Sequence, residues 1–425
     1  MLGMGTEDRL LAEEDVRELC ARGFESWGLR DKRVLFIIPD HTRTAPMDLI
    51  FRVIYELLAP QVKALDFLIA LGTHPPESPQ QIYRRLHISA AEHRERFPKA
   101  RFFNHEWKNP RQLVPIGRLT EADVEEISGG LMRREAEVKI NRMVFDYDAL
   151  VIVGPVFPHE VVGFSGGNKY LFPGIAGQEI IDLFHWLGAL ITSPVIIGNK
   201  YTPVREVVDR AASFLPIPRW NLSLVVKGEA LAGLFLGTPE EAWSAAADLS
   251  AKLHIVYKEK PFRKVLSQAP AMYDDLWTGG KCMYKLEPVV ADGGELIIYA
   301  PHIREVSVTH GKLIEQIGYH VRDYFLKQCD RFKHIPGGVL AHSTHVKGVG
   351  MFENGVEKPR IQVTLATQIP PEVCEKINLG YRDPATIRPE EWRGRENEGI
   401  LYVPKAGEML FRLRHDPFRR QVPKG

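Results

Sequence analysis

The sequence has few cysteines, almost no net charge and no long apolar run. Its four cysteines, Cys20, Cys282, Cys329 and Cys374, lie far apart without a CxxC pair. This spacing argues against a disulfide framework or a cysteine zinc site and favours a reducing cytoplasm. The 55 basic and 54 acidic side chains leave a formal charge of +1, so the chain has no overall field to attract nucleic acid. The composition therefore predicts no nucleic-acid partner.

The sequence also argues against a membrane protein and against disorder. No window of about 18 uncharged apolar residues occurs, and the first ten residues carry Glu7 and Asp8 in place of the apolar region of an export signal. With 35 glycines and 30 prolines, the composition is far from that of disordered or collagen-like chains. We predict no membrane partner and, at 425 residues, more than one folded domain.

Short apolar runs that end in small or polar residues indicate the strands of a parallel sheet. Such strands are buried on both faces and read as continuous aliphatic runs. The runs cover residues 34–38, 64–69 and 149–153. Between the first two, apolar residues recur at helical spacing over 47–58, which predicts the crossover helix of a right-handed βαβ unit. The predicted fold class is α/β.

Polar side chains follow each of the three predicted strands. Arg43, His74 and His159 lie just beyond the runs at 34–38, 64–69 and 149–153. In open α/β sheets, ligands bind outside the carboxyl ends of the strands, near the point where the strand order reverses. A single histidine after a strand is commonly a loop residue. Three such polar groups together predict a shared site.

The segment 158–174 combines flexible backbone with a lysine. Gly163, Gly166 and Gly167 allow main-chain N–H groups to turn toward an anion, and Ser165 adds a hydroxyl donor, so this turn is a candidate phosphate site. It is not a Walker loop, because Tyr rather than Ser or Thr follows Lys169. The alternative is a glycine-rich surface turn.

His185 lies beside the apolar stripe of a predicted short helix over 178–188. Ile180, Ile181, Phe184 and Leu187 form that stripe. A histidine in this position is either a hydrogen-bonded core residue or, as neutral imidazole, a ligand for nickel, copper, zinc or iron.

These residues together resemble the nickel-dependent lactate racemase family, whose members racemise or epimerise 2-hydroxy acids. The shared residues are Arg43 in the run Asp40-His41-Thr42-Arg43, His74 in Gly72-Thr73-His74-Pro75, His159, the Gly163–Lys169 turn and His185. Lys169 lies ten residues after His159, and His185 lies sixteen residues after Lys169, as in that family. The resemblance extends over nearly the whole chain.

The resemblance implies a nickel-pincer nucleotide, a pyridinium mononucleotide whose two sulfur-bearing arms hold nickel together with a ring carbon. Lys169 would anchor it covalently, His185 would ligate the nickel, and Ser165, Gly166 and Gly167 would receive its phosphate. Separate cofactor-biosynthesis proteins would build it. The cofactor would take hydride from C2 of the substrate, because removing that hydrogen as a proton would place a second negative charge beside the carboxylate.

The remaining residues of the resemblance concern the substrate. His74 and His159 would be the catalytic acid/base pair, one for each enantiomer. Asp40 and Arg43 would bind the substrate, with the Arg43 fork holding its carboxylate. From the second half of the chain, Thr278 and Lys281 would reach the same site. The residues expected to form the site are Asp40, Arg43, His74, His159, Ser165, Gly166, Gly167, Lys169, His185, Thr278 and Lys281.

We predict two α/β domains with the cofactor and the active site in the cleft between them. Residues 1–260 form the N-terminal domain, which carries the histidines and Lys169. Residues 261–395 form the C-terminal domain, which closes the site and has a strand over 295–300 and a helical pattern over 313–324. Residues 396–425 form a tail that returns to the first domain.

The sequence departs from the family at two places that bear on the substrate. Thr278 stands where the lactate-specific enzyme carries glutamine, and no tryptophan occurs over 341–350 to give the aromatic wall beside its cofactor. The segment 342–348 is instead rich in polar side chains, which would be left unpaired against a methyl group. The predicted function is thus racemisation or epimerisation at C2 of a 2-hydroxy acid, with a larger, aldonate-like substrate favoured over lactate.

Two other functions fit parts of the pattern. A non-catalytic protein that binds a nucleotide or a sugar acid would keep the glycine turn and Arg43 but would not need two facing imidazoles. A zinc hydrolase could use the three histidines, but the sequence lacks HExxH and no nearby carboxylate stands out as a general base.

Overall fold

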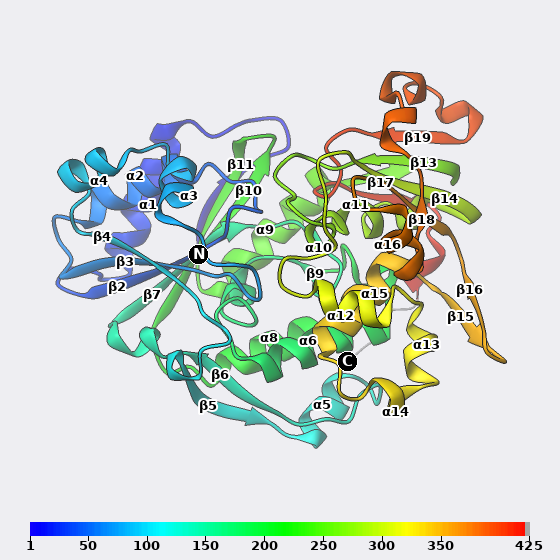
Figure 1. Ribbon diagram of the computed structural model, residues 1–425. Helices are drawn as coiled ribbons and strands as arrows, with labels where there is room; N and C mark the ends of the chain where they lie inside the picture. The colour runs from blue at the N-terminus through cyan, green and yellow to red at the C-terminus, as the bar shows by residue number, and fades with distance from the viewer. Residues whose placement is uncertain (421–425) are drawn as a thin grey trace.

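Two separate sheets form the centres of two α/β domains, which confirms the predicted fold class (Figure 1). The structure is a computed structural model and describes residues 1–420. The last five residues of the predicted tail, 421–425, lie outside the described residues.

The first sheet reverses its strand order between β2 and β7. Its order is β1 (Leu2–Gly5), β11 (Ala230–Gly237), β10 (Arg219–Lys227), β7 (Ala149–Pro155), β2 (Arg33–Ile38), β3 (Ala64–Ile69) and β4 (Ala100–Asn104). The strands from β10 to β4 are parallel, whereas β11 and β1 pair antiparallel at one edge. The chain runs outward from β2 to β4 and then returns to β7 on the other side of β2. Ligands bind at such a reversal in α/β sheets.

Helices cover both faces of this sheet. The side chains of β2 alternate between the two sides: Phe36 belongs to the core under α1 (Glu13–Ser26) and α2 (Met47–Leu58), and Ile37 belongs to the core under α6 (Gln178–Ile191) and α8 (Pro203–Ser213). Both residues are fully buried. The observed α2 confirms the helix predicted over 47–58. A further helix, α9 (Pro239–His254), packs on β10 and β11.

The helix α6 is longer than the predicted segment 178–188. Most of its side chains are buried, including Leu183, Phe184 and Leu187, because it lies between the first sheet and the second domain. It ends where Thr192 takes a positive φ of 85° just before Pro194.

The second sheet begins at β13 and is parallel throughout. Its order is β18 (Gly380–Tyr381), β17 (Gln362–Thr367), β14 (Val290–Ala300), β13 (Phe262–Gln268) and β19 (Ile400–Val403). One large apolar core lies on one face of this sheet, and a small cluster that includes Leu266 and Ile297 lies on the other. The strand predicted over 295–300 is the second half of β14.

The single helix predicted over 313–324 is wrong. The structure has α12 (Gly311–Ile317) and α13 (Arg322–Leu326), with a break at Gly318. Gly318 takes a φ of 74°, which continues neither helix. The apolar residues on either side of Gly318 follow a helical spacing because both short helices bury their apolar side chains in the same core.

The segment after residue 395 divides between two places. β19 is an edge strand of the second sheet. The following strand, β20 (Leu410–Leu413), pairs in parallel with β12 (Ile255–Lys258), which follows α9 directly. The buried Arg412 of β20 also donates a 2.8 Å hydrogen bond to the carbonyl of Pro194 in the first domain.

A seam between two helices joins the domains. The helix α15 (Gly337–Lys347) of the second domain packs along α6 of the first, and Figure 1 shows both near the middle of the molecule.

Among residues 1–420, no helix has the length and apolar character needed to cross a bilayer. The other elements are α3 (Pro79–Arg85), α4 (Ala90–Arg96), α5 (Glu121–Ile127), α7 (Ser193–Ile196), α10 (Leu276–Gly279), α11 (Lys281–Tyr284), α14 (Cys329–Phe332), α16 (Pro371–Lys376), β5 (Leu113–Leu119), β6 (Ala136–Asn141), β8 (Pro158–His159), β9 (Gly163–Phe164), β15 (Gly350–Glu353), β16 (Val356–Pro359) and the 3-10 turns η1 (Pro110–Gln112), η2 (Arg142–Asp146), η3 (Gly167–Tyr170), η4 (Glu287–Val289), η5 (Pro384–Thr386), η6 (Pro389–Trp392), η7 (Glu396–Glu398) and η8 (Pro417–Arg420).

Candidate active site

A cavity of about 140 Å³ lies between the two domains, at the reversal of the first sheet. Residues that are far apart in the sequence converge on it from the ends of β2, β3 and β7, from α6, and from α10, α11 and α15. Ten of the residues predicted for the site line this cavity: Asp40, Arg43, His74, His159, Ser165, Gly166, Lys169, His185, Thr278 and Lys281.

The remaining predicted residue, Gly167, does not line the cavity. A Cβ at Gly167 would lie 2.9 Å from the Cβ of Trp243 on α9, and one at Gly166 would lie 2.6 Å from Val156. Both glycines have positive φ, so the turn needs them to pack against its neighbours. The Ser165 hydroxyl is also engaged, since it accepts from the N–H of Phe157 at 2.9 Å and donates to the carbonyl of Pro155 at 3.2 Å.

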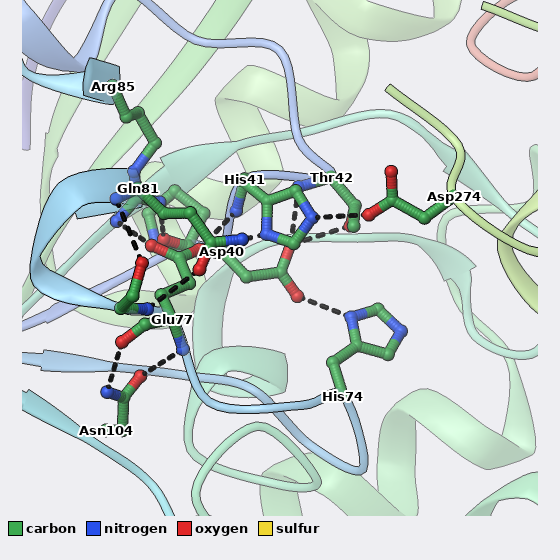
Figure 2. A network of polar contacts seen from close by, with 11 residues as sticks. Asp40, His41, Thr42, His74, Glu77, Gln81, Arg85, Asn104 and Asp274 are labelled. Atoms are coloured by element: carbon green, nitrogen blue, oxygen red, sulfur yellow. Dashed lines mark hydrogen bonds and ion pairs between the residues drawn. The ribbon is translucent and has the colours of Figure 1, made fainter. Parts of the chain in front are cut away.

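His74 is held by a carboxylate. Its Nδ1 donates a 2.6 Å hydrogen bond to Oδ2 of Asp40, while Oδ1 of Asp40 accepts from the N–H and the hydroxyl of Thr42 (Figure 2). Burial alone raises the pKa of Asp40, but the charge and hydrogen bond of His74, with Arg43 nearby, hold it well below its ordinary range. A proton on Nδ1 leaves Nε2 of His74 able to accept another.

The loop that carries Asp40 is anchored by a second network, also drawn in Figure 2. Oε1 of the buried Glu77 accepts from the backbone N–H of His41 at 2.6 Å, and Oε2 lies 3.2 Å from the guanidinium of Arg85. His41 also contacts Asp274 of the second domain at 3.2 Å through Nε2. The hydrogen bond to Glu77, with help from Asp274, raises the pKa of His41 to about 9. A protonated His41 therefore links the two domains beside the site.

His159 is buried, with only 6% of its surface exposed. Its Nδ1 accepts a 3.1 Å hydrogen bond from the N–H of Val161 and lies 3.3 Å from Oε2 of Glu160. Burial, and then the charges of Lys169 and Arg43, hold the pKa of His159 well below its usual value. The ring is thus neutral at neutral pH.

Two lysines of the cavity have lowered pKa values. Burial, followed by the charge of Arg43, lowers the pKa of both Lys169 and Lys281 to about 7. Part of each population is then a neutral amine at neutral pH, which is the nucleophilic form of lysine. Within residues 1–420, the Arg43 guanidinium has no hydrogen-bond partner, so its donors remain available for an anion.

His185 lines the cavity and has one ring nitrogen fixed by the backbone. Its Nδ1 donates a 2.6 Å hydrogen bond to the carbonyl of Ile181 one helical turn earlier, so Nε2 carries the lone pair. Burial lowers the pKa of His185 to about 4, which keeps the ring neutral. Such a ring, fixed by a carbonyl on one nitrogen, can ligate a metal with the other.

Three side chains that the sequence did not single out, Glu160, Trp277 and His310, also line the cavity. His342 and His345 on α15, from the polar segment 342–348, line it as well. The Trp277 ring stacks on His342 with centroids 3.9 Å apart, and its centroid lies 4.5 Å from that of the tilted His310 ring. Trp277 adjoins Thr278 in the sequence, and this adjacency was the one available sign of an aromatic wall. Most polar side chains of 342–348 have other partners; for example, Ser343 donates to the carbonyl of Gly318.

No cluster of three or more His, Cys, Asp or Glu side chains suited to a metal ion occurs within residues 1–420. Zinc hydrolases usually supply three protein ligands. A group that brings most of its own ligands to a metal would need only one from the protein.

Comparisons with known proteins agree with this geometry. Residues 19–195 match the model of the lactate racemase N-terminal domain. Among curated proteins, the lactate racemase of Thermoanaerobacterium thermosaccharolyticum is 24% identical over 63% of this chain, and that of Lactiplantibacillus plantarum is 28% identical over 57% of it. The matches span 60% and 50% of those two relatives.

Solved structures match over nearly the full chain. A protein from Thermotoga maritima is 33% identical, with a TM-score of 0.89, and the match covers 97% of this chain and 100% of that one. The lactate racemase apoprotein from Thermoanaerobacterium thermosaccharolyticum has the same fold, with a TM-score of 0.69 at 20% identity over 95% of this chain and 93% of that one. Residues 19–195 thus form a lactate racemase N-terminal domain, and the whole chain shares the fold of the lactate racemase apoprotein.

Proposed function

We propose that the chain is an isomerase that inverts C2 of a 2-hydroxy acid. The observation that carries this proposal is the convergence of His74 and His159, from the ends of two strands, on one cavity with Lys169 and His185. Two imidazoles are what inversion needs, because each enantiomer presents its hydroxyl to a different side of the site.

The residues present fit a nickel-pincer nucleotide. Lys169, with its pKa lowered to about 7, has the neutral amine that a covalent anchor requires. His185 offers a neutral Nε2 as a single nickel ligand, which suits a cofactor that supplies the other donors. When bound, the cofactor would supply a reversible hydride acceptor. The N–H groups near Gly166, which lines the cavity, remain the proposed phosphate contact, whereas the Ser165 hydroxyl would have to exchange one of its present partners.

The chain's own residues would move the hydroxyl proton and hold the carboxylate. His74, with Nδ1 fixed by Asp40, would take the proton at Nε2 from one enantiomer, and His159 would serve the other. Arg43 would bind the carboxylate through its free donors, with Lys281 approaching from the second domain. Asp40 would act through His74 and Thr42, which occupy both of its oxygens, more than by touching the substrate.

The polar walls favour a hydroxylated substrate over lactate. His310, His342 and His345 line the cavity, and Nε2 of His345 is buried without a hydrogen-bond partner among residues 1–420. Leaving such a group against a methyl would cost about 1–3 kcal/mol. The hydroxyl groups of an aldonate would meet these rings, and Thr278 would leave more room than a glutamine. The proposal also implies separate partner proteins that build the cofactor.

The test uses holoenzyme purified from cells that make the cofactor. We expect it to epimerise an aldonate such as gluconate at C2. Turnover of lactate with gluconate left untouched would contradict the aldonate proposal and retain the isomerase. His74→Gln and His159→Gln should each abolish turnover with ligand affinity preserved. Unchanged turnover in both variants would contradict the proposed role of these two histidines. A holoenzyme that binds the acid but turns over neither lactate nor gluconate would favour a protein that only binds nucleotides or sugar acids.

A further inference from the structure

Two groups compete for the same ring nitrogen of His159. The N–H of Val161 donates a 3.1 Å hydrogen bond to Nδ1, and Oε2 of Glu160 lies 3.3 Å from the same atom as an ion-pair contact, outside the alignment of a hydrogen bond. An N–H donor needs an unprotonated Nδ1, whereas a carboxylate acceptor needs a proton there. The two contacts therefore belong to two different protonation patterns of one ring.

The two patterns give Nε2 of His159 opposite properties. With Val161 as the partner, the neutral ring carries its proton on Nε2, so this atom donates and cannot act as a base. With Glu160 as the partner, the proton lies on Nδ1, and Nε2 can accept a proton from a hydroxyl. Only the second pattern suits the role that the proposed function gives to this ring.

We propose that Glu160 is a positioning residue that selects the working tautomer of His159. The inference rests on the proposed isomerase function and adds to it a residue that no part of the sequence pattern singled out. Asp40 already holds the Nδ1 proton of His74 in this way at 2.6 Å. The site would thus contain two imidazole–carboxylate pairs, one for each face of the substrate.

The proton movements balance in both directions. In one direction, Nε2 of His159 takes the hydroxyl proton, so the substrate O–H bond breaks and an Nε2–H bond forms. The resulting imidazolium keeps its proton on Nδ1, in a hydrogen bond to the carboxylate of Glu160. In the other direction, the imidazolium returns the Nε2 proton to the substrate oxygen. The Nδ1 proton stays between His159 and Glu160 throughout.

The surrounding charges explain why a carboxylate is needed here. Burial and nearby cations disfavour a second proton on His159. The charge of Glu160 acts in the opposite sense on its cationic neighbours, since it raises the pKa of Lys169 and Lys281. It would stabilise a transient imidazolium in the same way. The groups that bear on the ring are Glu160, Lys169, Arg43, Lys285 and His185.

Nitrogen-15 NMR of histidine side chains in the full-length holoenzyme tests this inference, because the two neutral tautomers give different shifts. The His159 signals are assigned by their loss in His159→Gln. We expect the Nδ1–H tautomer in the wild type, the Nε2–H tautomer in Glu160→Ala, and retention of Nδ1–H in Glu160→Gln, whose amide oxygen can still accept. An Nε2–H tautomer in the wild type, or an unchanged tautomer in Glu160→Ala, would overturn the inference.

Kinetics of the same variants give a second readout. We expect kcat/KM to fall by about 10²-fold in Glu160→Ala, the lower range for general acid–base catalysis, and by less in Glu160→Gln. Glu18→Gln, at an exposed carboxylate on α1, is the control and should keep wild-type kinetics. A wild type without isomerase activity would contradict the proposed function. An active wild type with an unchanged His159 tautomer in Glu160→Ala would contradict only the role of Glu160.

Discussion

Oδ1 of Asp182 accepts a 2.9 Å hydrogen bond from the backbone N–H of Gly338, and this contact ties the first turn of α15 to α6 across the domain boundary. His185 follows Asp182 by one helical turn on α6. A carboxylate is well placed at the N-terminus of a helix, where it meets unpaired N–H groups and the positive end of the helix dipole. The contact therefore fixes the helix that carries His185 against the helix that carries His342 and His345.

Removing this carboxylate should loosen the two domains. We expect Asp182→Ala to lower the free energy of unfolding by about 1–3 kcal/mol, because the N–H of Gly338 loses its partner inside the protein. The measurement is urea unfolding of the variant beside the wild type. Asp182→Asn keeps an oxygen acceptor and should lose less. Equal stability of Asp182→Ala and the wild type would show that the contact does not hold the domains.

Asp40→Asn should impair catalysis with little effect on substrate affinity. In Asp40→Asn the amide oxygen stays with the N–H of Thr42, so the NH₂ group faces His74, which would move the ring proton to Nε2 and remove the base. We expect kcat to fall by about 10²-fold or more, with a small change in KM. Steady-state kinetics of the holoenzyme measures both. A large rise in KM at unchanged kcat would instead indicate that Asp40 contacts the substrate directly.

Lys169 and Lys281 should react with acylating reagents at unusually low pH. Their pKa of about 7 makes each amine about half neutral at pH 7, whereas a lysine with an ordinary pKa near 10.4 is almost fully protonated. We expect brief labelling of cofactor-free protein to rise steeply between pH 6 and 8 at these two positions. Peptide mass spectrometry reads out each site. Labelling that follows the other lysines at every pH would contradict the lowered pKa.

Acid should destabilise the protein in part through His254. This ring is buried and bonds Ser250 and the carbonyl of Val226, and burial lowers its pKa to about 4. The unfolded chain, with a pKa near 6.5, binds the proton first, so stability falls as the pH drops from 6.5 toward 4. At pH 5 the expected cost is about 2 kcal/mol. Unfolding at pH 7.5 and pH 5 should show a smaller acid loss in His254→Gln, whereas the exposed His87→Gln should match the wild type.

The sequence predicts those parts of the fold that depend on local patterns. The strands near 34–38, 64–69 and 149–153 are buried on both faces, so their apolar runs are unbroken. The rule that ligands bind where strand order reverses then brings Arg43, His74 and His159 together. The glycine turn and the helical stripe pointed to Lys169 and His185, and the family resemblance gave these two their roles and added Thr278 and Lys281.

Other features depend on contacts between segments that no local pattern encodes. Gly167 lies in a glycine-rich turn that resembles a phosphate loop. It packs instead against Trp243, on a helix that begins more than seventy residues later in the chain. The contacts of Trp277 with His310 and His342 join three separate segments of the second domain. The proposed role of Glu160 rests on its distance to a ring nitrogen of His159, which the sequence does not give.

The covalent state of Lys169 tests the central claim most directly. Intact-mass and metal analysis of protein purified from its native host, followed by peptide mapping, locates any adduct. We predict one pincer-nucleotide adduct on Lys169 and about one nickel ion for each chain. An unmodified Lys169 in preparations that fully retain 2-hydroxy acid isomerase activity would contradict it.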